Sequence, residues 1–389
     1  MRIAIDARWI FPEISGIGNY TRQLLTQYGR MDIPHTLLLL FNDQTLLERT
    51  LTETGLTHAS NIEAHCLPWG VFSPKSQLRL PSFLKRERAD VFHSPNYMIP
   101  FAAFPRHRTG RTACVTTIHD VIPLLFPDHA PKSRKTRLFP IFRALMNEVG
   151  RRSDIIVTVS ETSRQDIIKQ LHIPTTKAGN VHTVYNGVSD HFSPSEVKSP
   201  KKSESITLLY VGRSDPYKNV ETLIKALNQL RRTTTLDVQL KIAGAPDPRY
   251  PQAAELAQTL GISHAVNWTG YLSDAALVEE YRNADLLVHP SRYEGFGLQI
   301  LEAMACGTPV ISSNAGSLTE VAGDAAILFD PLDTQKLADS IAQVLTHPDI
   351  ADNMRQKGLK QAAQFTWETA ARKTMALYEA ACAMNPGVS

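Results

Sequence analysis

Short apolar runs alternate along the chain with longer segments in which apolar residues recur every three or four positions. The first pattern is typical of buried strands and the second of amphipathic helices. Strands are predicted at residues 2–6, 36–41, 90–93, 113–119, 155–159, 182–185, 207–211, 238–243, 266–268, 286–289, 308–312 and 327–329. Helices are predicted at residues 20–28, 161–171, 220–231, 275–283, 298–305 and 334–345. This alternation indicates an α/β fold with parallel sheets covered on both faces.

The alternation is interrupted at residues 193–203, a segment with two prolines and no apolar periodicity, which is typical of a linker. A chain of 389 residues is also too long for one ordinary core. We therefore expect two doubly wound, Rossmann-like domains, at residues 1–195 and 204–365. Because such sheets bind ligands at the carboxyl ends of their strands, we expect the two domains to face a central cleft.

The composition is that of an ordinary globular protein, with 43% hydrophobic and 20% charged residues. No run approaches the ~20 apolar residues that cross a bilayer. The first predicted strand begins at residue 2, which leaves no room for a signal peptide. Four cysteines lie far apart without paired spacing, namely Cys66, Cys114, Cys306 and Cys382. They are typical of reduced core residues rather than of disulfides or a zinc site, so we expect a cytoplasmic protein.

Charge is divided unequally between the two halves. Residues 1–200 carry 24 Lys and Arg against 17 Asp and Glu, a net +7, whereas residues 201–389 carry 17 against 21, a net −4. This asymmetry suggests an anionic partner on one side only, and nothing in the sequence points to nucleic acid.

Residues 132–152 contribute most to the basic half. Seven cations, Lys132, Arg134, Lys135, Arg137, Arg143, Arg151 and Arg152, face Glu148 alone and alternate with aliphatic and aromatic residues. Such a segment can lie in an anionic membrane interface, where each cation adds about 1 kcal/mol. The alternative is a helix packed on the sheet with a solvated basic face. Pro140 would either kink or start such a helix.

Two glutamates enclose a segment with unusual chemistry. Gly295 and Gly297 directly follow Glu294 and form a loop whose backbone can approach a ligand closely. Residues 298–304 are then predicted to form a short, almost wholly apolar helix in which Glu302 is the one charge. A buried carboxylate needs a hydrogen-bonding partner, which the two adjacent hydroxyls of a ribose would supply. The N-terminus of the same helix suits a phosphate. The alternative is a structural salt bridge in the core.

Two cations follow the first strand of the second domain. Arg213 and Lys218 lie on a loop shaped by Gly212 and Pro216, at the strand end where a ligand is expected. Arginine offers phosphate a planar fork and lysine a compact charge. The two could therefore bind phosphate, and the sequence contains no convincing Asp-x-Asp or His-rich metal cluster. The alternative is a pair of solvated surface cations.

The N-terminal half contributes weaker candidates. Gly16 and Gly18 precede the first helix, where backbone amides can contact phosphate, although two glycines can also mark a simple turn. His119 ends the strand at residues 113–119, where it can face a ligand, although a lone histidine at a strand end is more often structural. His93 ends another strand, where it contacts an acceptor or is simply packed.

Several of these motifs together resemble a known family. Residues 286–311, with two glutamates separated by seven residues, are similar to the C-terminal motif of the retaining glycosyltransferases of family four. Residues 209–213, Lys218 with Asn219, and residues 321–326 continue the match, which covers almost the whole chain. The resemblance implies the GT-B fold. It also implies that a last helix, at residues 366–385, packs back on the N-terminal domain.

The resemblance further implies roles for individual residues. Glu302 would hold the ribose, Arg213 and Lys218 the diphosphate, and Glu294 the sugar hydroxyls. His119 would lie beside the transferred sugar. The residues expected to bind the donor are Gly16, Gly18, Arg213, Lys218, Tyr271, Leu272, Ser291, Glu294, Gly295, Phe296, Gly297, Leu298 and Glu302; those expected to act in catalysis are His119, Glu294, Arg213 and Lys218. Tyr271 could instead be a packing residue.

The chain is therefore expected to be a retaining hexosyltransferase that needs neither cofactor nor metal. Residues 6–8, 16–20 and 92–100 resemble bacterial mannosyltransferases of surface polysaccharide assembly, which favours GDP-mannose as the donor. A glycan or a lipid-linked glycan at the inner face of the membrane would be the acceptor. The alternatives are a sugar-nucleotide epimerase or hydrolase and a non-catalytic carbohydrate-binding relative.

Overall fold

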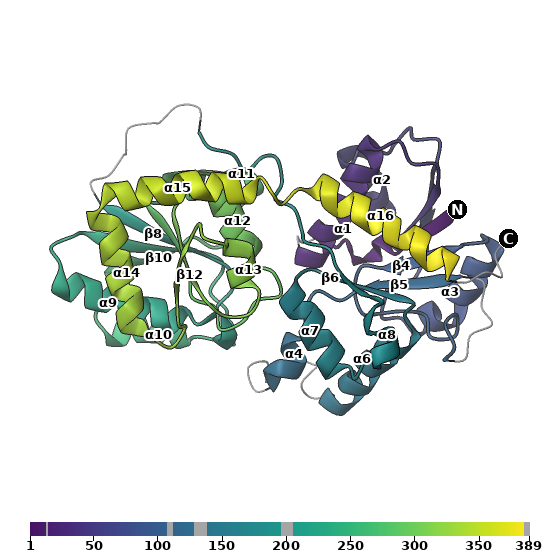
Figure 1. Cartoon of the computed structure of the whole chain (residues 1–389), viewed down its shortest axis with the longest axis horizontal. Coiled ribbons are helices and arrows are strands. Elements are labelled where there is room, and N and C mark those ends of the chain that lie inside the picture. Colours follow the sequence, from purple (N-terminus) through teal and green to yellow (C-terminus); the bar gives the residue numbers. More distant parts are fainter. Residues whose placement is uncertain (13–14, 107–111, 128–137, 196–204, 385–389) are drawn as a thin grey trace. The chain divides into compact units, whose positions relative to one another are not determined.

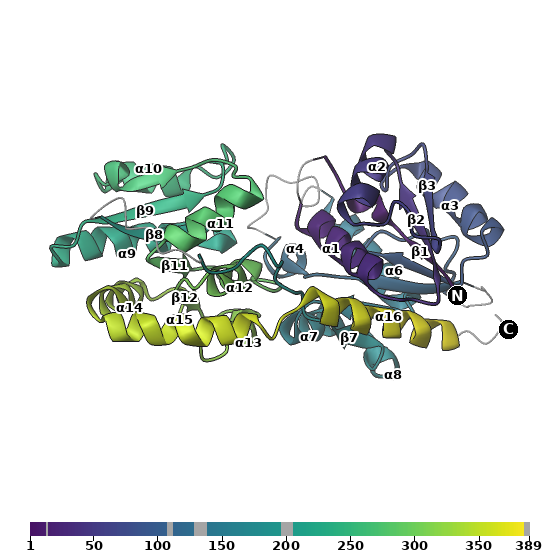
Figure 2. The same cartoon turned by 90° about the horizontal axis from the view of Figure 1, so that it is seen from above.

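The computed structural model describes residues 1–12, 15–106, 112–127, 138–195 and 205–384. The chain divides into two compact units. The N-terminal unit comprises Met1–Val121, Leu138–Gly187 and Trp367–Ser389, and the C-terminal unit comprises Ile122–Arg137 and Val188–Thr366. Each unit contains one parallel sheet with helices packed against it, as Figures 1 and 2 show. The predicted α/β class is confirmed.

Seven parallel strands form the sheet of the N-terminal unit, in the order β3-β2-β1-β4-β5-β6-β7. Their bounds are β1 Arg2–Ile5, β2 Thr36–Phe41, β3 Ile62–Cys66, β4 Val91–Ser94, β5 Ala113–Thr117, β6 Ile155–Thr158 and β7 Val181–Thr183. The central strands are apolar and buried because helices cover both faces of the sheet. The chain reverses its direction across the sheet between β1 and β4, so the loops that follow these two strands form the expected ligand edge.

The helices of this unit begin at recognisable signals. They are η1 Ala7–Trp9, α1 Gly16–Arg30, α2 Gln44–Glu53, α3 Pro74–Arg86, α6 Phe139–Arg152, α7 Glu161–Gln170, α8 Thr175–Ala178 and α16 Trp367–Ala383. The side chains of Ser15, Asp43, Ser73 and Ser160 accept bonds from free backbone N–H groups at the starts of α1, α2, α3 and α7. Pro140 lies in the first turn of α6, so it starts the helix and does not kink it.

The last helix, α16, belongs to the N-terminal unit. Trp367, Ala371 and Tyr378 lie in the same buried cluster as β1, β2 and α1. The Tyr378 hydroxyl is hydrogen-bonded to Nδ1 of His93, at 2.7 Å, inside this core. Figure 1 shows α16 in yellow beside the purple α1. The chain therefore returns to its first unit after completing the second.

The C-terminal unit has six parallel strands in the order β10-β9-β8-β11-β12-β13. They are β8 Ile206–Val211, β9 Val238–Ala243, β10 Val266–Trp268, β11 Leu286–His289, β12 Val310–Ser313 and β13 Ile327–Phe329. The helices are α4 Ile122–Leu125, η3 Pro216–Lys218, α9 Val220–Thr233, α10 Gln252–Thr259, η4 Ser263–Ala265, α11 Asp274–Asn283, α12 Leu298–Ala305, α13 Leu318–Ala322, α14 Thr334–Thr346 and α15 Pro348–Ala362. The strand order reverses between β8 and β11, which makes the loops after these two strands the natural ligand site.

Candidate functional site

The loops after β8 and β11 converge on Glu294. The Lys218 ammonium donates to Oε1 and Oε2 of Glu294, at 2.7 and 2.9 Å. The Ser291 hydroxyl donates to Oε1 at 2.7 Å, and Nε2 of His289 lies 3.0 Å from the same oxygen. The structure therefore brings together three predicted residues, Lys218, Ser291 and Glu294. It adds His289, whose position in the apolar run before the motif gave no sign of this role.

Glu294 is buried, the side chain of Lys218 is only 13% exposed, and both groups are charged. Burial alone would raise the pKa of Glu294, but the charge of Lys218 and the bond with His289 hold this pKa well below its ordinary value. Burial opposes the charge of Lys218 as well, yet the neighbouring Glu294 raises the pKa of the ammonium. The carboxylate therefore presents a fixed negative charge beside a fixed positive one, an arrangement that can accept from sugar hydroxyls and attract a phosphate at adjacent positions.

The loop at residues 294–297 is held rigidly. Gly297 has a φ of +97°, and a Cβ there would come within 2.6 Å of Leu318. Gly316 has a φ of +59°, and a Cβ there would come within 2.9 Å of the carbonyl oxygen of Glu294. The Ser317 hydroxyl donates to the carbonyl oxygens of Glu294 and Phe296, at 2.9 Å each. Because Gly297 and Gly316 have no Cβ, the backbone at residues 316–318 can pack directly against the loop at residues 294–297.

The helix α12 begins directly after this loop, with Gly297 as its N-cap in a left-handed conformation. No side chain caps its N-terminus within the described part of the chain. The predicted residues Gly295, Phe296, Gly297 and Leu298 therefore surround a helix start whose positive dipole end is available to an anion.

Arg213 lies apart from this cluster. Its guanidinium forms a two-pronged pair with Asp215, at 2.5 and 2.8 Å, and its side chain is 64% exposed. The Tyr210 hydroxyl donates to the Arg213 carbonyl at 2.7 Å and fixes the backbone there. Arg213 is thus on the predicted loop, but among the described residues its guanidinium is hydrogen-bonded to Asp215 and not to Glu294. An incoming anion would have to compete with Asp215 for its donors.

Asn219 joins the two loops and was predicted only as part of a motif. Its φ is +59°, and its side-chain amide donates to the carbonyls of Pro290 and Pro331, at 2.9 and 2.8 Å. The backbone N–H of Arg292 also donates to the Tyr217 carbonyl at 2.7 Å. These bonds fix the loop carrying Lys218 against the loop carrying Glu294.

Glu302 has a neutral partner. The Tyr281 hydroxyl, on α11, donates to Oε2 of Glu302 at 2.7 Å, and Tyr281 is completely buried. No Lys, Arg or His pairs with Glu302 in the ranges that the structure describes, so a core salt bridge is not its role there. Burial raises the pKa of Glu302 to about 7; the Tyr281 bond opposes this rise and the charge of Asp274 adds to it. The carboxyl group therefore changes its charge near neutral pH.

The turn after β10 carries Tyr271 and Leu272. Gly270 has a φ of +74°, which turns the chain sharply before Tyr271. Tyr271 is 71% exposed, so the alternative in which it packs in the core is wrong. Leu272 is half-buried. An exposed aromatic ring at a carboxyl-end turn is suited to stacking on a flat ligand group.

In the N-terminal unit, Gly16 and Gly18 both lie in the first turn of α1. The backbone N–H of Gly18 donates to the Ser15 hydroxyl at 3.0 Å. A Cβ on Gly18 would press on Ser15 and on the Trp9 carbonyl, whereas one on Gly16 would meet nothing within 4 Å. A side chain at Gly18 would therefore be crowded, whereas one at Gly16 would have space.

The two histidines at strand ends differ in their surroundings. Nε2 of His119 lies 3.0 Å from the Pro95 carbonyl, and the His119 ring packs edge-on against Tyr20. Burial lowers the pKa of His119 to about 4, so the imidazole is neutral and can offer a hydrogen bond but not a charge. His93 is completely buried and bonded at both ring nitrogens, to Thr117 and Tyr378. Of the two hypotheses for His93, packing is correct.

The basic stretch at residues 132–152 is described only in part, since Lys132, Arg134, Lys135 and Arg137 lie outside the described residues. Arg151 and Arg152 both pair with Glu148, as does Arg106. Arg152 also donates to the carbonyls of Phe101 and Phe104. These cations are therefore engaged with the protein itself, while Arg143 and Ile141 are exposed.

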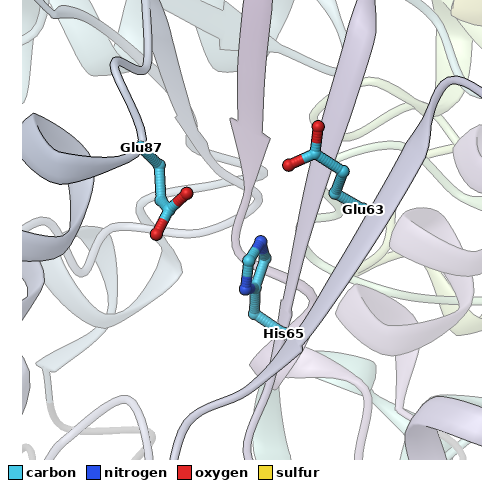
Figure 3. A group of neighbouring side chains, drawn as sticks. All are labelled: Glu63, His65 and Glu87. Carbon is cyan, nitrogen blue, oxygen red and sulfur yellow. The ribbon is translucent and has the colours of Figure 1, made fainter.

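Figure 3 shows a second charged cluster, Glu63, His65 and Glu87, whose potential ligand atoms lie within 4.8 Å of one another. Arg2 binds Glu63 through two bonds, at 2.9 and 2.7 Å, and donates to the Glu87 carbonyl at 2.7 Å. The hydrogen bond from Arg2 holds the pKa of Glu63 below its ordinary value. An arginine thus already supplies the positive charge that this cluster needs, and the arrangement does not favour a metal ion.

Comparison with known families gives two adjoining matches. Residues 14–192 match the family described as "Glycosyltransferase Family 4", and residues 193–361 match "Glycosyl transferases group 1". The O-antigen chain mannosyltransferase B of Escherichia coli is 32% identical over 295 residues, which cover 74% of each chain. The serotype-specific mannosyltransferase WbdA of Escherichia coli is 30% identical over 72% of this chain, which spans about a third of WbdA. An MMP alpha-(1->4)-mannosyltransferase from Mycolicibacterium hassiacum is 32% identical over 247 residues, 62% of this chain and 58% of that protein.

Solved structures with the same fold cover nearly the whole chain. A sucrose-phosphate synthase from Thermosynechococcus elongatus superposes with a TM-score of 0.75 at 21% identity, over 97% of this chain and 98% of the other. The Anabaena protein HepE, in complex with UDP and glucose, superposes with a TM-score of 0.71 at 20% identity, over 97% and 98% of the two chains. At this identity the likeness concerns the fold alone, and it confirms the predicted GT-B fold.

Proposed function

Because the chain belongs to the family 4 glycosyltransferases, we propose that it transfers a mannosyl unit from GDP-mannose to an acceptor hydroxyl with retention of configuration. That it is a glycosyltransferase follows from the family. The choice of mannose is supported by relatives named as mannosyltransferases at 30–32% identity. The observation that carries the mechanism is the largely buried, charged Lys218–Glu294 pair beside the start of α12, which no side chain of the described residues caps.

In this proposal the diphosphate of the donor binds between Lys218, Arg213 and the N-terminus of α12. Two cations and a helix dipole would stabilise the negative charge that grows on the diphosphate as the glycosidic bond breaks. Arg213 would leave Asp215 for the phosphate, which its exposed side chain can do at little cost to the fold. These groups would provide the positive charge without a metal ion or another cofactor.

Glu294 and the backbone amides of residues 296–298 would hold the sugar hydroxyls. The oxygens of Glu294 already accept bonds from Lys218, Ser291 and His289, so the carboxylate is fixed before a sugar arrives. A fixed acceptor orients the sugar without a further loss of side-chain freedom. The acceptor hydroxyl would then attack on the face that the diphosphate leaves, and the departing phosphate would take its proton.

Glu302 would accept bonds from both hydroxyls of the ribose. Its Oε2 is held by Tyr281, and its ionised form is the stronger acceptor. Tyr271 and Leu272 are assigned to the base side of the nucleotide, whereas Ser291 would serve donor binding by holding Glu294. Gly16, Gly18 and His119 are assigned to the diphosphate and the transferred sugar by the family resemblance, and the neutral imidazole of His119 suits a hydrogen bond to a sugar hydroxyl.

The acceptor in this proposal is a growing surface polysaccharide, presented at the cytoplasmic face of a membrane. The basic N-terminal half supports a peripheral contact with anionic lipid. None of the described helices has the length and apolar character that crossing a bilayer requires.

Thermal-shift titration with a panel of nucleotide sugars tests the donor assignment. A donor at 100-fold over its dissociation constant stabilises the folded state by about 2.7 kcal/mol. We expect GDP-mannose to raise the melting temperature at concentrations where UDP-glucose does not. A larger rise in melting temperature with UDP-glucose than with GDP-mannose would show that the donor assignment is wrong. Release of mannose from GDP-mannose at the same rate with and without acceptor would indicate a hydrolase instead.

A further inference from the structure

The helix α3 has an exposed face whose composition differs from that of an ordinary surface helix. Its buried side consists of Ser76, Leu80, Phe83 and Leu84. The exposed side consists of residues spaced three or four apart, which we call the α3 face: Lys75, Leu78, Arg79, Ser82, Lys85 and Arg86. Figure 2 shows α3 beside β3, the strand at the edge of the N-terminal sheet.

The α3 face is strongly cationic. The helix Pro74–Arg86 contains four cations and no acidic residue. Among the described residues, Lys75, Arg79 and Lys85 have no carboxylate partner, and Arg86 pairs only with Glu87. The guanidinium of Arg79 lies over the Trp69 ring, 5.8 Å from its centroid, which holds it in place without neutralising it. Surface cations of a globular protein are more often interspersed with carboxylates.

Two large apolar side chains lie within and beside these cations. Leu78 is 77% exposed and Phe72, directly before the helix, is 62% exposed. Phe72 packs edge-on against Trp9, with the ring centroids 5.4 Å apart, so its exposed ring is held by the buried one. A single exposed apolar residue needs no explanation. Two of them, flanked by unpaired cations, form the combination that inserts into an anionic lipid interface.

We propose that the α3 face docks the protein on an anionic lipid bilayer, with Leu78 and Phe72 entering the interface and Lys75, Arg79 and Lys85 contacting the headgroup phosphates. This inference rests on the membrane contact in the proposed function and gives it a specific surface. It is independent of the donor and of the transfer reaction.

The geometry favours α3 over the basic stretch at residues 132–152. Of the cations described in that stretch, Arg151 and Arg152 are paired with Glu148, whereas three cations of α3 remain without a carboxylate. Phe72 ends the loop that follows β3, so it lies on the carboxyl-end side of the N-terminal sheet, where ligands of such folds bind. A bilayer at this surface would therefore be near the edge that is expected to receive the acceptor.

Co-sedimentation of the full-length protein with vesicles tests the proposal. Vesicles of phosphatidylcholine with phosphatidylglycerol are compared with vesicles of phosphatidylcholine alone, at low and at high salt. The triple variant Lys75→Glu, Arg79→Glu, Lys85→Glu should lower the partition onto anionic vesicles at least tenfold. Replacing Leu78 and Phe72 by Ser should lower it several-fold at both salt concentrations, because the apolar contribution is not screened.

Two controls make the result specific. The triple variant Lys225→Glu, Arg232→Glu, Lys336→Glu makes the same change of net charge at exposed positions of the C-terminal unit and should bind vesicles as the unaltered protein does. The double variant Lys75→Glu, Lys85→Glu leaves the Arg79–Trp69 contact intact and should still lose most of the binding. Melting temperature and mannosyl transfer to a soluble acceptor are measured for every variant, so that loss of folding or of catalysis is recognised separately.

Binding that is indifferent to reversal of the α3 charges, or that falls equally in the C-terminal control, overturns the proposal. So does equal binding to vesicles without phosphatidylglycerol. If dextran sulfate competes fully and the Ser variants bind normally, the face recognises an acidic polymer and not a bilayer.

Discussion

Replacing Tyr281 by Phe isolates the role of a single hydrogen bond at Glu302. The variant keeps the buried ring and removes only the hydroxyl that donates to Oε2 at 2.7 Å. A hydrogen bond to a charged group contributes about 1.5–3 kcal/mol, and one to a neutral group about 0.5–1.5 kcal/mol. The difference, about 1 kcal/mol or slightly more, favours the ionised carboxylate. Since 1.36 kcal/mol corresponds to one pKa unit, losing the bond should raise the pKa of Glu302 by about one unit.

The consequence is a shifted pH dependence of donor binding. Burial already raises the pKa of Glu302 to about 7. If the ionised form binds the ribose, donor affinity rises with pH through this value, and the rise should move to about pH 8 in the variant. Near pH 7 the variant should bind several-fold more weakly, and above pH 9 the two proteins should differ little. Asp274 raises the same pKa, and Cys306, whose own pKa is raised to about 12, stays neutral in this range.

Isothermal titration of GDP-mannose between pH 6 and pH 9.5, a range set about the pKa of Glu302, measures this directly. Tyr378→Phe is the matched control, because it also removes a hydroxyl from a buried, hydrogen-bonded tyrosine, but in the other unit. It should lower stability and leave the pH dependence unchanged. Superimposable profiles for the Tyr281 variant and the unaltered protein would refute the reasoning, as would a loss of affinity that is equal at every pH.

Three further results are expected. Lys218→Ala should destabilise the fold by about 3–5 kcal/mol, because it leaves Glu294 buried without its charged partner. Arg213→Ala should lower the rate of transfer with almost no change in melting temperature, because the Arg213 side chain is exposed. Equal losses of stability for the two variants in chemical denaturation would contradict this. The unaltered protein should lose up to about 3 kcal/mol of stability as pH rises from about 4.5 to about 7, because burial raises the pKa of Glu302 from about 4.5 in the unfolded chain to about 7 in the folded protein. The Glu302→Gln variant should not show this loss. A stability difference between the two proteins that does not change with pH would show that the carboxyl group is ionised throughout. Transfer should survive EDTA, and activity restored only by one added divalent ion would show that Lys218 and Arg213 do not suffice.

The sequence predicted those elements whose apolar pattern is strong. Strands such as Thr36–Phe41 and Ile206–Val211 are continuous apolar runs that only a sheet covered on both faces explains. The edge strand Ile62–Cys66 was not predicted, because two of its five residues are a glutamate and a histidine. The helix Pro74–Arg86 was also missed, since its buried side is mostly formed by residues in its second half and an internal proline weakens the helical pattern.

The candidate site was predictable where residues are close in sequence, and less so where partners are distant. The glycines and glutamates of residues 294–302 carry their own spacing signal. The partner of Glu302 is Tyr281, 21 positions earlier on another helix, and the partner of His93 is Tyr378, 285 positions later. The spacing of apolar residues along the sequence does not reveal contacts between residues so far apart. For this reason the sequence left the roles of Glu302 and His93 open, and the packing of α11 and α16 was needed to identify their partners.

The anomeric configuration of the product tests the central claim most directly. The purified protein is incubated with GDP-mannose, whose sugar is α-linked to phosphate, and octyl α-mannoside as acceptor, and the one-bond carbon–proton coupling at the new anomeric centre is measured by NMR. Retaining transfer predicts an α-linked disaccharide, formed by the unaltered protein and lost when Glu294 is replaced by Gln. A β-linked product, or a product that the Glu294→Gln protein forms equally fast, would contradict the account.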